Sequence, residues 1–198
     1  MTTFILVRHG AHDRLNRFLD GRRPGVHLND LGRRQAEWAA GRLAGLAVDA
    51  LYTSPLERTR ETAAAIGRCL GLEPTVELAL EELDFGSWSG KTIADLEPLE
   101  DWRQWNEARA ISPTPAGDTM RAAQTRILNF IDALRRDHPD GCFVLVGHSD
   151  PLKAALFFYL GLSLDKLHRI AVAPGSLNRV EIDGWGATVV GLNETMPE

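Results

Sequence analysis

Two histidines in this sequence each follow a short apolar run. His9 ends the segment FILVRH, and His148 ends the segment VLVGH and is followed by Ser149. An imidazole can act as a nucleophile, a base or a phosphate ligand near neutral pH, and a serine at a sharp turn can also be a nucleophile. The residues around these two positions therefore decide which chemistry the chain can support.

The segment GHSDP is similar to the Gly-x-Ser-x-Gly elbow of serine hydrolases, but the match is incomplete. Pro151 stands where the second glycine belongs, and the sharp turn of that elbow needs small residues on both sides. In such enzymes an acid and then a histidine follow the serine in separate loops, whereas here only His168 follows, with Asp165 almost adjacent. We therefore expect Ser149 to cap the following helix, with a secondary hydrogen bond to a ligand as the alternative.

The segment HGAHD raises the question of a metal site. His9, His12 and Asp13 are all metal-binding side chains, and His27 follows further along. A metal site needs several ligands that converge with suitable geometry, and no HExxH or CxxC spacing is present. His12 and His27 also fit as loop histidines on a polar surface. We therefore expect no metal site and no cofactor.

The rest of the sequence alternates strand patterns with helix patterns. Short apolar runs predict buried strands at residues 3–7, 48–54 and 142–147. Amphipathic spacing predicts helices at residues 29–46, 55–71, 119–138 and 151–162. An alternating pattern in the tail predicts two antiparallel strands around Asp183 and Gly184. This order predicts a single domain, residues 1–198, built as a three-layer α/β/α sandwich with a mostly parallel central sheet.

Several residues are suited to the ends of these helices, and three tryptophans lie between them. Asn29 or Asp30 is a plausible N-cap, Pro55 suits the first turn of its helix, and Gly71 suits the end of that helix. The segment from 81 to 108 predicts a turn and one or two short helices that carry Trp88, Trp102 and Trp105. Core packing is a more common use of tryptophan than a ligand pocket, so we expect these side chains in the core.

Composition limits the partners of the chain. The 22 Lys and Arg against 27 Asp and Glu give a net charge of -5, which argues against a surface that coats nucleic acid but allows a small basic pocket. The longest apolar stretch, residues 154–162, is too short to cross a bilayer, and the N-terminus lacks the basic start of a signal peptide. With only two cysteines, in different predicted elements, we expect a cytoplasmic protein. Neither nucleic acid nor membrane is an expected partner, and the oligomeric state is not readable from the sequence.

Four segments together carry a resemblance to a known family. They are RHG at 8–10, YTSPLERTRETA at 52–63, EELDFG at 81–86 and VGHSD at 146–150. Their order and local spacing resemble the histidine phosphatase superfamily, also called the phosphoglycerate mutase-like family, along nearly the whole chain. The segments GRRPGVHLNDLGRRQA and PAGDTMRAAQTR resemble two further parts of the family pattern, with Asp118 in place of the usual Glu.

The resemblance implies a phosphoglycerate mutase-like fold and a phosphatase that acts on a small phosphorylated substrate. His9 would be the nucleophile and would carry a transient phosphohistidine. Arg8, Arg58 and His148 would bind the phosphoryl group, and the neighbouring cations would lower the pKa of His9 and keep it neutral. Glu82 would be the general acid and base of the reaction. It matches the position of the family's proton donor, with the adjacent glutamate, residue 81, as the alternative.

The sequence departs from the family pattern in the loop after RHG. His12 stands where a Thr or Ser is common, and Leu15 stands where the family has an Asn. Asn16, one step later, is therefore carried over as a candidate phosphate contact. Gly21 and Arg22 are also expected to bind substrate, although Arg22 and the neighbouring Arg23 either bind a second anionic group or face solvent. Ser149 completes the set as a candidate secondary contact.

A phosphatase is favoured over a mutase of the same family. The resemblance implies that mutases of this family are longer chains, with an insertion that places paired arginines over the site. Here the segment between Glu82 and Asp118 holds only Arg103 and Arg109, apart from each other. A shorter lid leaves a phosphohistidine open to water, which favours hydrolysis. The alternatives are a mutase-type phosphotransferase and, in a different class, a phosphate-binding regulatory module with little turnover.

Overall fold

A six-stranded sheet forms the centre of the computed structural model, which describes residues 1–197. The strands are β1 (Thr2–Arg8), β2 (Ala50–Thr53), β3 (Thr75–Val76), β4 (Cys142–Gly147), β5 (Leu177–Ile182) and β6 (Ala187–Glu194). Their order is β3-β2-β4-β1-β5-β6, with the first four parallel and the last two antiparallel. The predicted mostly parallel sheet and the predicted antiparallel tail are confirmed.

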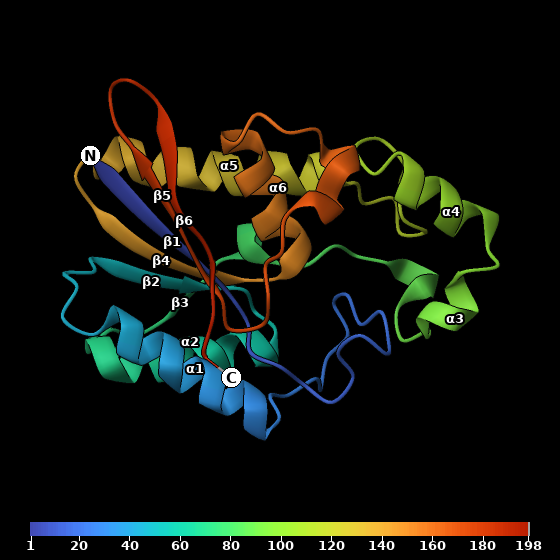
Figure 1. The fold of residues 1–198 in the computed structure, drawn as a ribbon, viewed down its shortest axis with the longest axis horizontal. Coiled ribbons are helices and arrows are strands. Elements are labelled where there is room, and N and C mark those ends of the chain that lie inside the picture. Colours follow the sequence, from blue (N-terminus) through green and yellow to red (C-terminus); the bar gives the residue numbers. More distant parts are fainter. Residues whose placement is uncertain (198) are drawn as a thin grey trace.

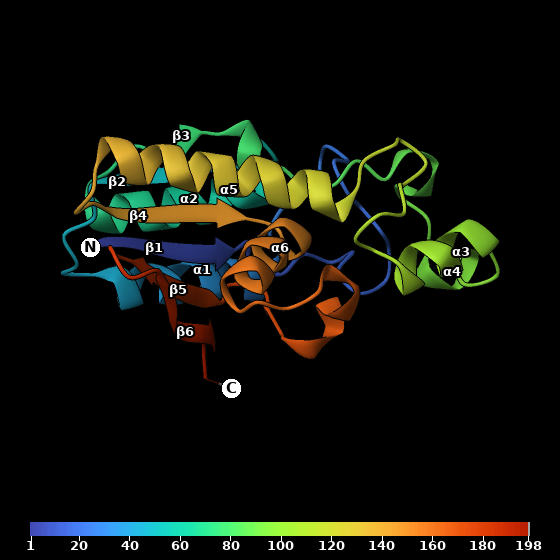
Figure 2. The same ribbon diagram turned by 90° about the horizontal axis from the view of Figure 1, so that it is seen from above.

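Helices cover both faces of this sheet. The α-helices are α1 (Asp30–Leu43), α2 (Glu57–Leu70), α3 (Ile93–Leu96), α4 (Glu100–Glu107), α5 (Met120–Asp137) and α6 (Ser149–Tyr159), and the short 3-10 helices are η1 (Leu78–Leu80), η2 (Gly86–Trp88) and η3 (Leu164–Arg169). Figure 1 shows α1 and α2 on one face of the sheet and α5 and α6 on the other. Figure 2 shows α3 and α4 beyond the sheet, past the ends of β1 and β4. The predicted sandwich is confirmed, and none of the helices within residues 1–197 is long and apolar enough to cross a bilayer.

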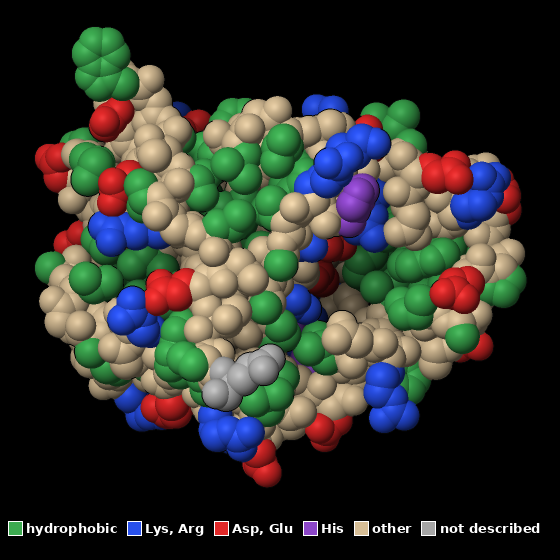
Figure 3. Space-filling view, in the orientation of Figure 1, with side chains coloured by type: hydrophobic (Ala, Val, Ile, Leu, Met, Phe, Trp, Pro, Cys, Tyr) green, Lys and Arg blue, Asp and Glu red, His purple; other side chains and the backbone are tan. Residues whose placement is uncertain are grey.

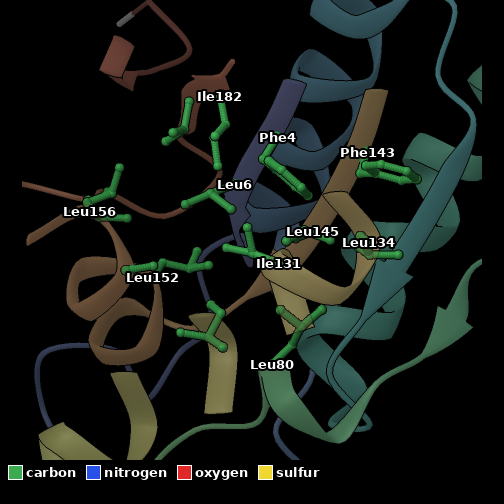
Figure 4. Packing of buried hydrophobic residues seen from close by; sticks show 14 residues of the cluster. Phe4, Leu6, Leu80, Ile131, Leu134, Phe143, Leu145, Leu152, Leu156 and Ile182 are labelled. Carbon is green, nitrogen blue, oxygen red and sulfur yellow. The ribbon is translucent and has the colours of Figure 1, made fainter. Parts of the chain in front are cut away.

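Alternate residues of β1 face opposite helical layers. Phe4 and Leu6 belong to a buried cluster with side chains of α5 and α6, including Ile131 (Figure 4). Ile5 and Val7 belong to a second cluster with side chains of α1 and α2. A strand buried on both faces needs apolar residues at every position, which explains the continuous run seen in the sequence.

The helix ends agree with the predicted caps except at the start of α2. Asn29 is the N-cap of α1 and accepts a hydrogen bond of 2.9 Å from the Gly32 N–H. Gly71 ends α2 with the left-handed φ of 69° that favours glycine. Pro55 was expected inside the first turn, but α2 begins two residues later, at Glu57. Pro55 thus belongs to the turn that leads from β2 into the helix.

The three tryptophans form one aromatic cluster beside the sheet. Trp88 and Trp105 are 2% and 1% exposed, and the rings of Trp102 and Trp105 stack with centroids 5.3 Å apart. Phe157 of α6 belongs to the same buried cluster. The expected core packing is confirmed, and this cluster holds α4 next to the ends of the strands.

The parallel register brings the two predicted histidines together. β1 and β4 are neighbours, and Arg8 lies beside Gly147, so the next residues, His9 and His148, leave the sheet side by side. β2 lies on the other side of β4 and leads into α2, whose first turn carries Arg58. Ligands of open parallel sheets bind at this carboxyl edge. The topology therefore gathers these residues where a ligand is expected.

Candidate active site

A cavity of about 210 Å³ opens at the carboxyl edge of the sheet. We call it the catalytic cavity. Figure 3 shows the molecule hollowed on this side, with charged and His side chains around the hollow. The sequence-predicted residues that line the cavity are Arg8, His9, Asn16, Gly21, Arg58, Glu82 and Ser149. Two predicted residues, His148 and Arg22, lie outside this lining.

His9 is held as a neutral imidazole with one free nitrogen. Its Nδ1 lies 2.8 Å from the carbonyl oxygen of Gly10, which can only accept, so Nδ1 carries the proton and Nε2 the lone pair. Burial lowers the pKa of His9 well below its usual value, and the positive charges of Arg58 and Arg8 lower it further. At neutral pH, His9 therefore has the protonation state that a nitrogen nucleophile requires.

Close backbone packing supports the loop that carries His9. A side chain at Gly10 would clash with the carbonyl of Gly32 in α1, so the two segments can meet only as glycines. The Gly10 N–H donates to Thr62 Oγ1 at 3.1 Å, and the Ala11 N–H donates to Gln35 Oε1 at 2.8 Å. Thr62 and Gln35 thus position the loop; both lie in segments that carry the family resemblance, but no role was predicted for either residue.

Two arginines lie close to His9: Arg58, which is buried, and Arg8, which is half-buried. Arg58 donates from Nη2 to the Gly21 carbonyl at 2.7 Å, and Arg8 donates from Nη1 to the Val172 carbonyl at 2.7 Å. One further donor atom of each, Arg8 Nε and Arg58 Nη1, is buried and has no hydrogen-bond partner within residues 1–197. An unpaired buried guanidinium N–H is costly, and an anion in the cavity would satisfy it. The pair therefore suits an anionic ligand.

His148 lies behind these groups, fully buried. The centroid of its ring is 5.2 Å from that of His9. Arg58 donates from Nη2 to His148 Nδ1 at 3.2 Å, so the proton of the neutral ring is on Nε2, which lies 2.8 Å from Ser54 Oγ. Burial, and then the charge of Arg58, lowers the pKa of His148. In the free protein His148 therefore orients Arg58, and Ser54, which the sequence did not reveal, orients His148.

The structure distinguishes the two adjacent glutamates. Glu82 lines the catalytic cavity, and its Oε1 accepts a hydrogen bond of 3.0 Å from the Leu83 N–H. Burial and the negative charge of Asp150 raise the pKa of Glu82 to about 7. Glu81 instead lies 3.3 Å from the guanidinium of Arg22. Glu82 therefore has both the position and the protonation range of a general acid.

Arg22 braces the Glu82 segment and lies outside the lining of the catalytic cavity, so its binding of substrate stays a prediction. Its Nε donates to the Glu82 carbonyl at 2.8 Å, and its Nη2 donates to Asp118 Oδ2 at 3.3 Å. Arg126 donates to the Glu81 carbonyl at 2.5 Å. The guanidinium of Arg22 is thus engaged by protein acceptors, and its neighbour Arg23 is exposed.

The remaining predicted contacts lie at the cavity wall. Asn16 is exposed and has a left-handed φ of 60°. Gly21 has a φ of 54°, and a Cβ there would come within 2.8 Å of the Phe85 ring. Ser149 is the first helical residue of α6, and His148 occupies the N-cap position. The expected capping role of Ser149 is therefore wrong.

His12 is a cavity residue that sequence reasoning missed. It was expected on a polar surface, which holds for His27, but His12 is only 7% exposed and its ring centroid is 5.4 Å from that of His9. Its Nδ1 lies 3.9 Å from Asp20 Oδ2, and neither atom has a hydrogen-bond partner in the described part of the chain. Burial and the charge of Arg58 lower the pKa of His12 to about 4. The sequence feature that could have predicted this position is that His12 directly follows the segment RHGA, which carries the nucleophile His9.

The geometry does not assemble the other two chemistries weighed from the sequence. Ser149 has no hydrogen bond to a histidine among the described residues, so the Ser–His pair of a serine hydrolase is not formed. Within residues 1–197, no three His, Cys, Asp or Glu side chains are grouped so that they could hold a metal ion. The candidate site is therefore an anion-binding cavity with a histidine nucleophile and a carboxyl group.

Comparison with known proteins identifies the family. The model of the histidine phosphatase superfamily (branch 1) matches residues 4–195. The chain belongs to this superfamily. It is therefore an enzyme of the histidine phosphatase type, and the family inferred from its motifs is confirmed.

Relatives of this histidine phosphatase cover most of its length. Phosphoserine phosphatase 1 of Hydrogenobacter thermophilus is 30% identical over 98% of this chain and 93% of that protein. A bifunctional protein of Mycobacterium tuberculosis is 32% identical over 98% of this chain, which spans only 54% of that protein. The solved structure of YhfR from Bacillus stearothermophilus superposes with a TM-score of 0.88, at 24% identity and over 96% of both chains. This last likeness supports the fold, and the predicted fold class is confirmed.

Proposed function

We propose that this protein hydrolyses a phosphomonoester by two successive phosphoryl transfers, to and from His9. The observation that carries this proposal is the state of His9. It is neutral, its Nε2 lone pair is free, and it lies close to two arginines that each have a buried, unpaired donor atom. Glu82, with a pKa of about 7, completes the set at the same cavity. Nucleophile, charge stabilisers and proton donor are thus preorganised around one small space.

In the first transfer, the lone pair on His9 Nε2 attacks phosphorus on the side opposite the ester oxygen. The N–P bond forms as the P–O ester bond breaks, and the leaving oxygen takes the proton of Glu82. The free donors of Arg8 and Arg58 bind the phosphoryl oxygens, where charge concentrates. His148 joins them when the phosphoryl dianion raises its pKa and Nδ1 gains a proton.

In the second transfer, water attacks the phosphorus of phosphohistidine. The ionised Glu82 accepts the proton of that water as the new P–O bond forms, and the N–P bond breaks to return neutral His9 and inorganic phosphate. Asn16, Gly21 and Ser149 supply further contacts at the wall of the cavity. No step uses a metal ion, so the proposed reaction is metal-independent.

The segment between Glu82 and Asp118 is the short lid of the catalytic cavity, and its arginines favour hydrolysis over transfer to a second substrate. Of the two arginines in that segment, Arg103 is bound within α4 to Glu100 and Glu107, on the exposed side of the helix. Arg109 pairs with Asp150 at 3.6 Å. Paired arginines do not cover His9, which leaves the phosphohistidine accessible to water.

The test uses p-nitrophenyl phosphate with the wild type, His9→Ala and His27→Ala. His27 is the matched control because it is exposed and paired with Glu61, away from the cavity. Turnover should persist in EDTA, stop with vanadate, which mimics the geometry of five-coordinate phosphorus, and fall by at least about 10³-fold in His9→Ala. His27→Ala should retain the wild-type rate.

A labelled substrate tests the intermediate itself. Rapid denaturation of the wild type during turnover should trap phosphate on the protein in an acid-labile, alkali-stable form, as expected for phosphohistidine. His9→Ala should trap none. Retained turnover in His9→Ala, or loss of turnover in EDTA, would contradict the proposal.

A further inference from the structure

A second cavity, of about 330 Å³, lies beside the catalytic cavity. We call it the outer pocket. It is lined by Asn106, Arg109, Lys153, Asp165, Leu167 and His168. Figure 3 shows a His side chain among Lys and Arg side chains close to the hollow. Four of the six lining residues can donate hydrogen bonds from nitrogen to an anion, and two of these four, Arg109 and Lys153, are cationic side chains.

The outer pocket shares a wall with the catalytic cavity. Asp150 lines the catalytic cavity, and its Oδ2 lies 3.6 Å from Nη1 of Arg109, which lines the outer pocket. Lys153 follows Asp150 by three residues on α6, so their side chains lie on the same face of the helix. The charge of Arg8 also acts on Lys153. The two cavities are therefore neighbours, with the Arg109–Asp150 pair between them.

Lys153 is a cation without a partner. It is half-buried, and its ammonium group has no hydrogen bond or ion pair within residues 1–197. Burial lowers its pKa, and the positive charges of Arg8 and Arg109 act in the same direction, against the charge of Asp150. An anion placed beside Lys153 would relieve both the desolvation and the repulsion.

The single carboxylate of the outer pocket is already engaged. Oδ1 of Asp165 accepts a hydrogen bond of 2.9 Å from the Ala110 N–H, and its Oδ2 accepts one of 3.2 Å from Ser163 Oγ. These bonds tie η3 to the end of α4. Asp165 therefore has a structural use, and the lysine and the arginine retain capacity for an external anion.

Arg109 is held in place before any ligand arrives. Its guanidinium lies 4.0 Å above the ring of Trp105, and its Nη2 donates to Asn106 Oδ1 at 2.7 Å. A guanidinium fixed on an aromatic face loses little entropy when it binds a carboxylate or a phosphate. The outer pocket thus combines one preorganised cation with one unpartnered cation.

We propose that the outer pocket binds a second anionic group, a carboxylate or a phosphate, of the substrate whose phosphoryl group lies against His9. This inference rests on the proposed function and narrows it to phosphomonoesters with a second negative charge. Lys153 and Arg109 bind that group by charge-assisted hydrogen bonds, and His168 contributes an N–H at the exposed side. The three residues determine specificity and take no part in the phosphoryl transfer.

The test compares substrates that differ only in the second anionic group. Phosphoserine and phosphoethanolamine differ by a carboxylate, and so do 3-phosphoglycerate and glycerol 3-phosphate, while fructose 1,6-bisphosphate and fructose 6-phosphate differ by a phosphate. The wild type should prefer the more highly charged member of at least one kind of pair by about tenfold or more in kcat/KM, chiefly through KM. The preferred pair identifies the group.

Variants connect this preference to the outer pocket. Lys153→Gln should remove most of this preference, a loss of about tenfold for a tenfold preference, whereas Lys153→Arg should retain most of it and His168→Gln should reduce it less. Lys166→Gln is the matched control, because Lys166 is an exposed cation of the same η3 that does not line the pocket. It should keep the wild-type preference.

Two results would overturn this inference. One is equal kcat/KM within every substrate pair, and the other is an unchanged preference in both Lys153→Gln and His168→Gln. Turnover of p-nitrophenyl phosphate and its loss in His9→Ala report on the proposed function separately, because this substrate carries no second anionic group. A chain that hydrolyses p-nitrophenyl phosphate but shows no preference retains the proposed function and lacks the outer specificity site.

Discussion

The catalytic cavity and the outer pocket both gather positive charge, but they do so on different frameworks. In the catalytic cavity, Arg8 ends β1, His9 follows it and Arg58 lies in the first turn of α2, and all three side chains are bonded to backbone carbonyls. In the outer pocket, the end of α4, η3 and one turn of α6 supply Arg109, His168 and Lys153 from less buried positions. The difference separates chemistry, which needs fixed geometry, from selectivity, which a few outer side chains can change.

The largest expected effect comes from a substitution that affects the catalytic cavity and leaves the outer pocket unchanged. Glu82→Gln removes the proton donor and should lower kcat/KM for an alkyl phosphomonoester by about 10²- to 10⁴-fold. The loss should be smaller for p-nitrophenyl phosphate, because p-nitrophenolate leaves without protonation. The preference for a second anionic group should survive, since the outer pocket is untouched. Steady-state kinetics on both substrates measures these effects.

Glu81→Gln is the control for this prediction. Glu81 pairs with Arg22 at 3.3 Å, and without this pair Arg22 keeps its bonds to the Glu82 carbonyl and to Asp118, so Glu82 stays in place. Its rate should stay close to that of the wild type. A loss in Glu81→Gln as large as that in Glu82→Gln would assign the proton donor to Glu81 instead.

The second prediction concerns the aromatic cluster that holds Arg109 of the outer pocket in place. Trp105 is 1% exposed and lies beneath Arg109, so Trp105→Ala should lower the free energy of unfolding by about 3–5 kcal/mol. Trp185 is 100% exposed, and Trp185→Ala should change it by less than about 0.5 kcal/mol. Denaturant titration measures both. Equal losses would mean that the aromatic cluster does not support this part of the fold.

The smallest expected effect is a pH shift caused by Asp150, which lies between the catalytic cavity and the outer pocket. The negative charge of Asp150 helps to raise the pKa of Glu82 to about 7, so kcat/KM should fall as pH rises above about 7 and Glu82 loses its proton. Asp150→Asn removes that charge and lowers the pKa of Glu82. The alkaline limb of the pH profile of kcat/KM should therefore move to lower pH. The low pKa of His9 keeps the acidic limb well below pH 6.5. A pH profile in which the alkaline limb stays in place or moves to higher pH would contradict this link.

Local patterns in the sequence were sufficient for most of the fold. Continuous apolar runs marked β1 and β4, because strands buried on both faces need apolar residues throughout. Asn29 and Gly71 marked helix ends because caps depend on single residues. β3 was not predicted, since Thr75 and Val76 are exposed and only their pairing with β2 makes them a strand.

The site was predictable where its residues directly follow predicted strands. His9 and His148 come after two strands that are neighbours in the sheet, so their meeting followed from topology. The roles of Arg22 and His12 could not be predicted, because loop conformation decides which acceptors a side chain meets. Arg22 meets the Glu82 carbonyl and Asp118, whereas His12 turns into the cavity beside Asp20.

By itself, the sequence determined the fold class, the family and the residues that meet at the carboxyl edge of the sheet. Hydrophobic periodicity, caps and ordered motifs are local, and they need no knowledge of distant contacts. Only the tertiary structure decided the tautomer of His9, the pKa of Glu82 and the neighbourhood of Lys153. These properties depend on burial and on charges contributed by segments far apart in the chain. Their combined electrostatic effect on one group exists only after the chain has folded.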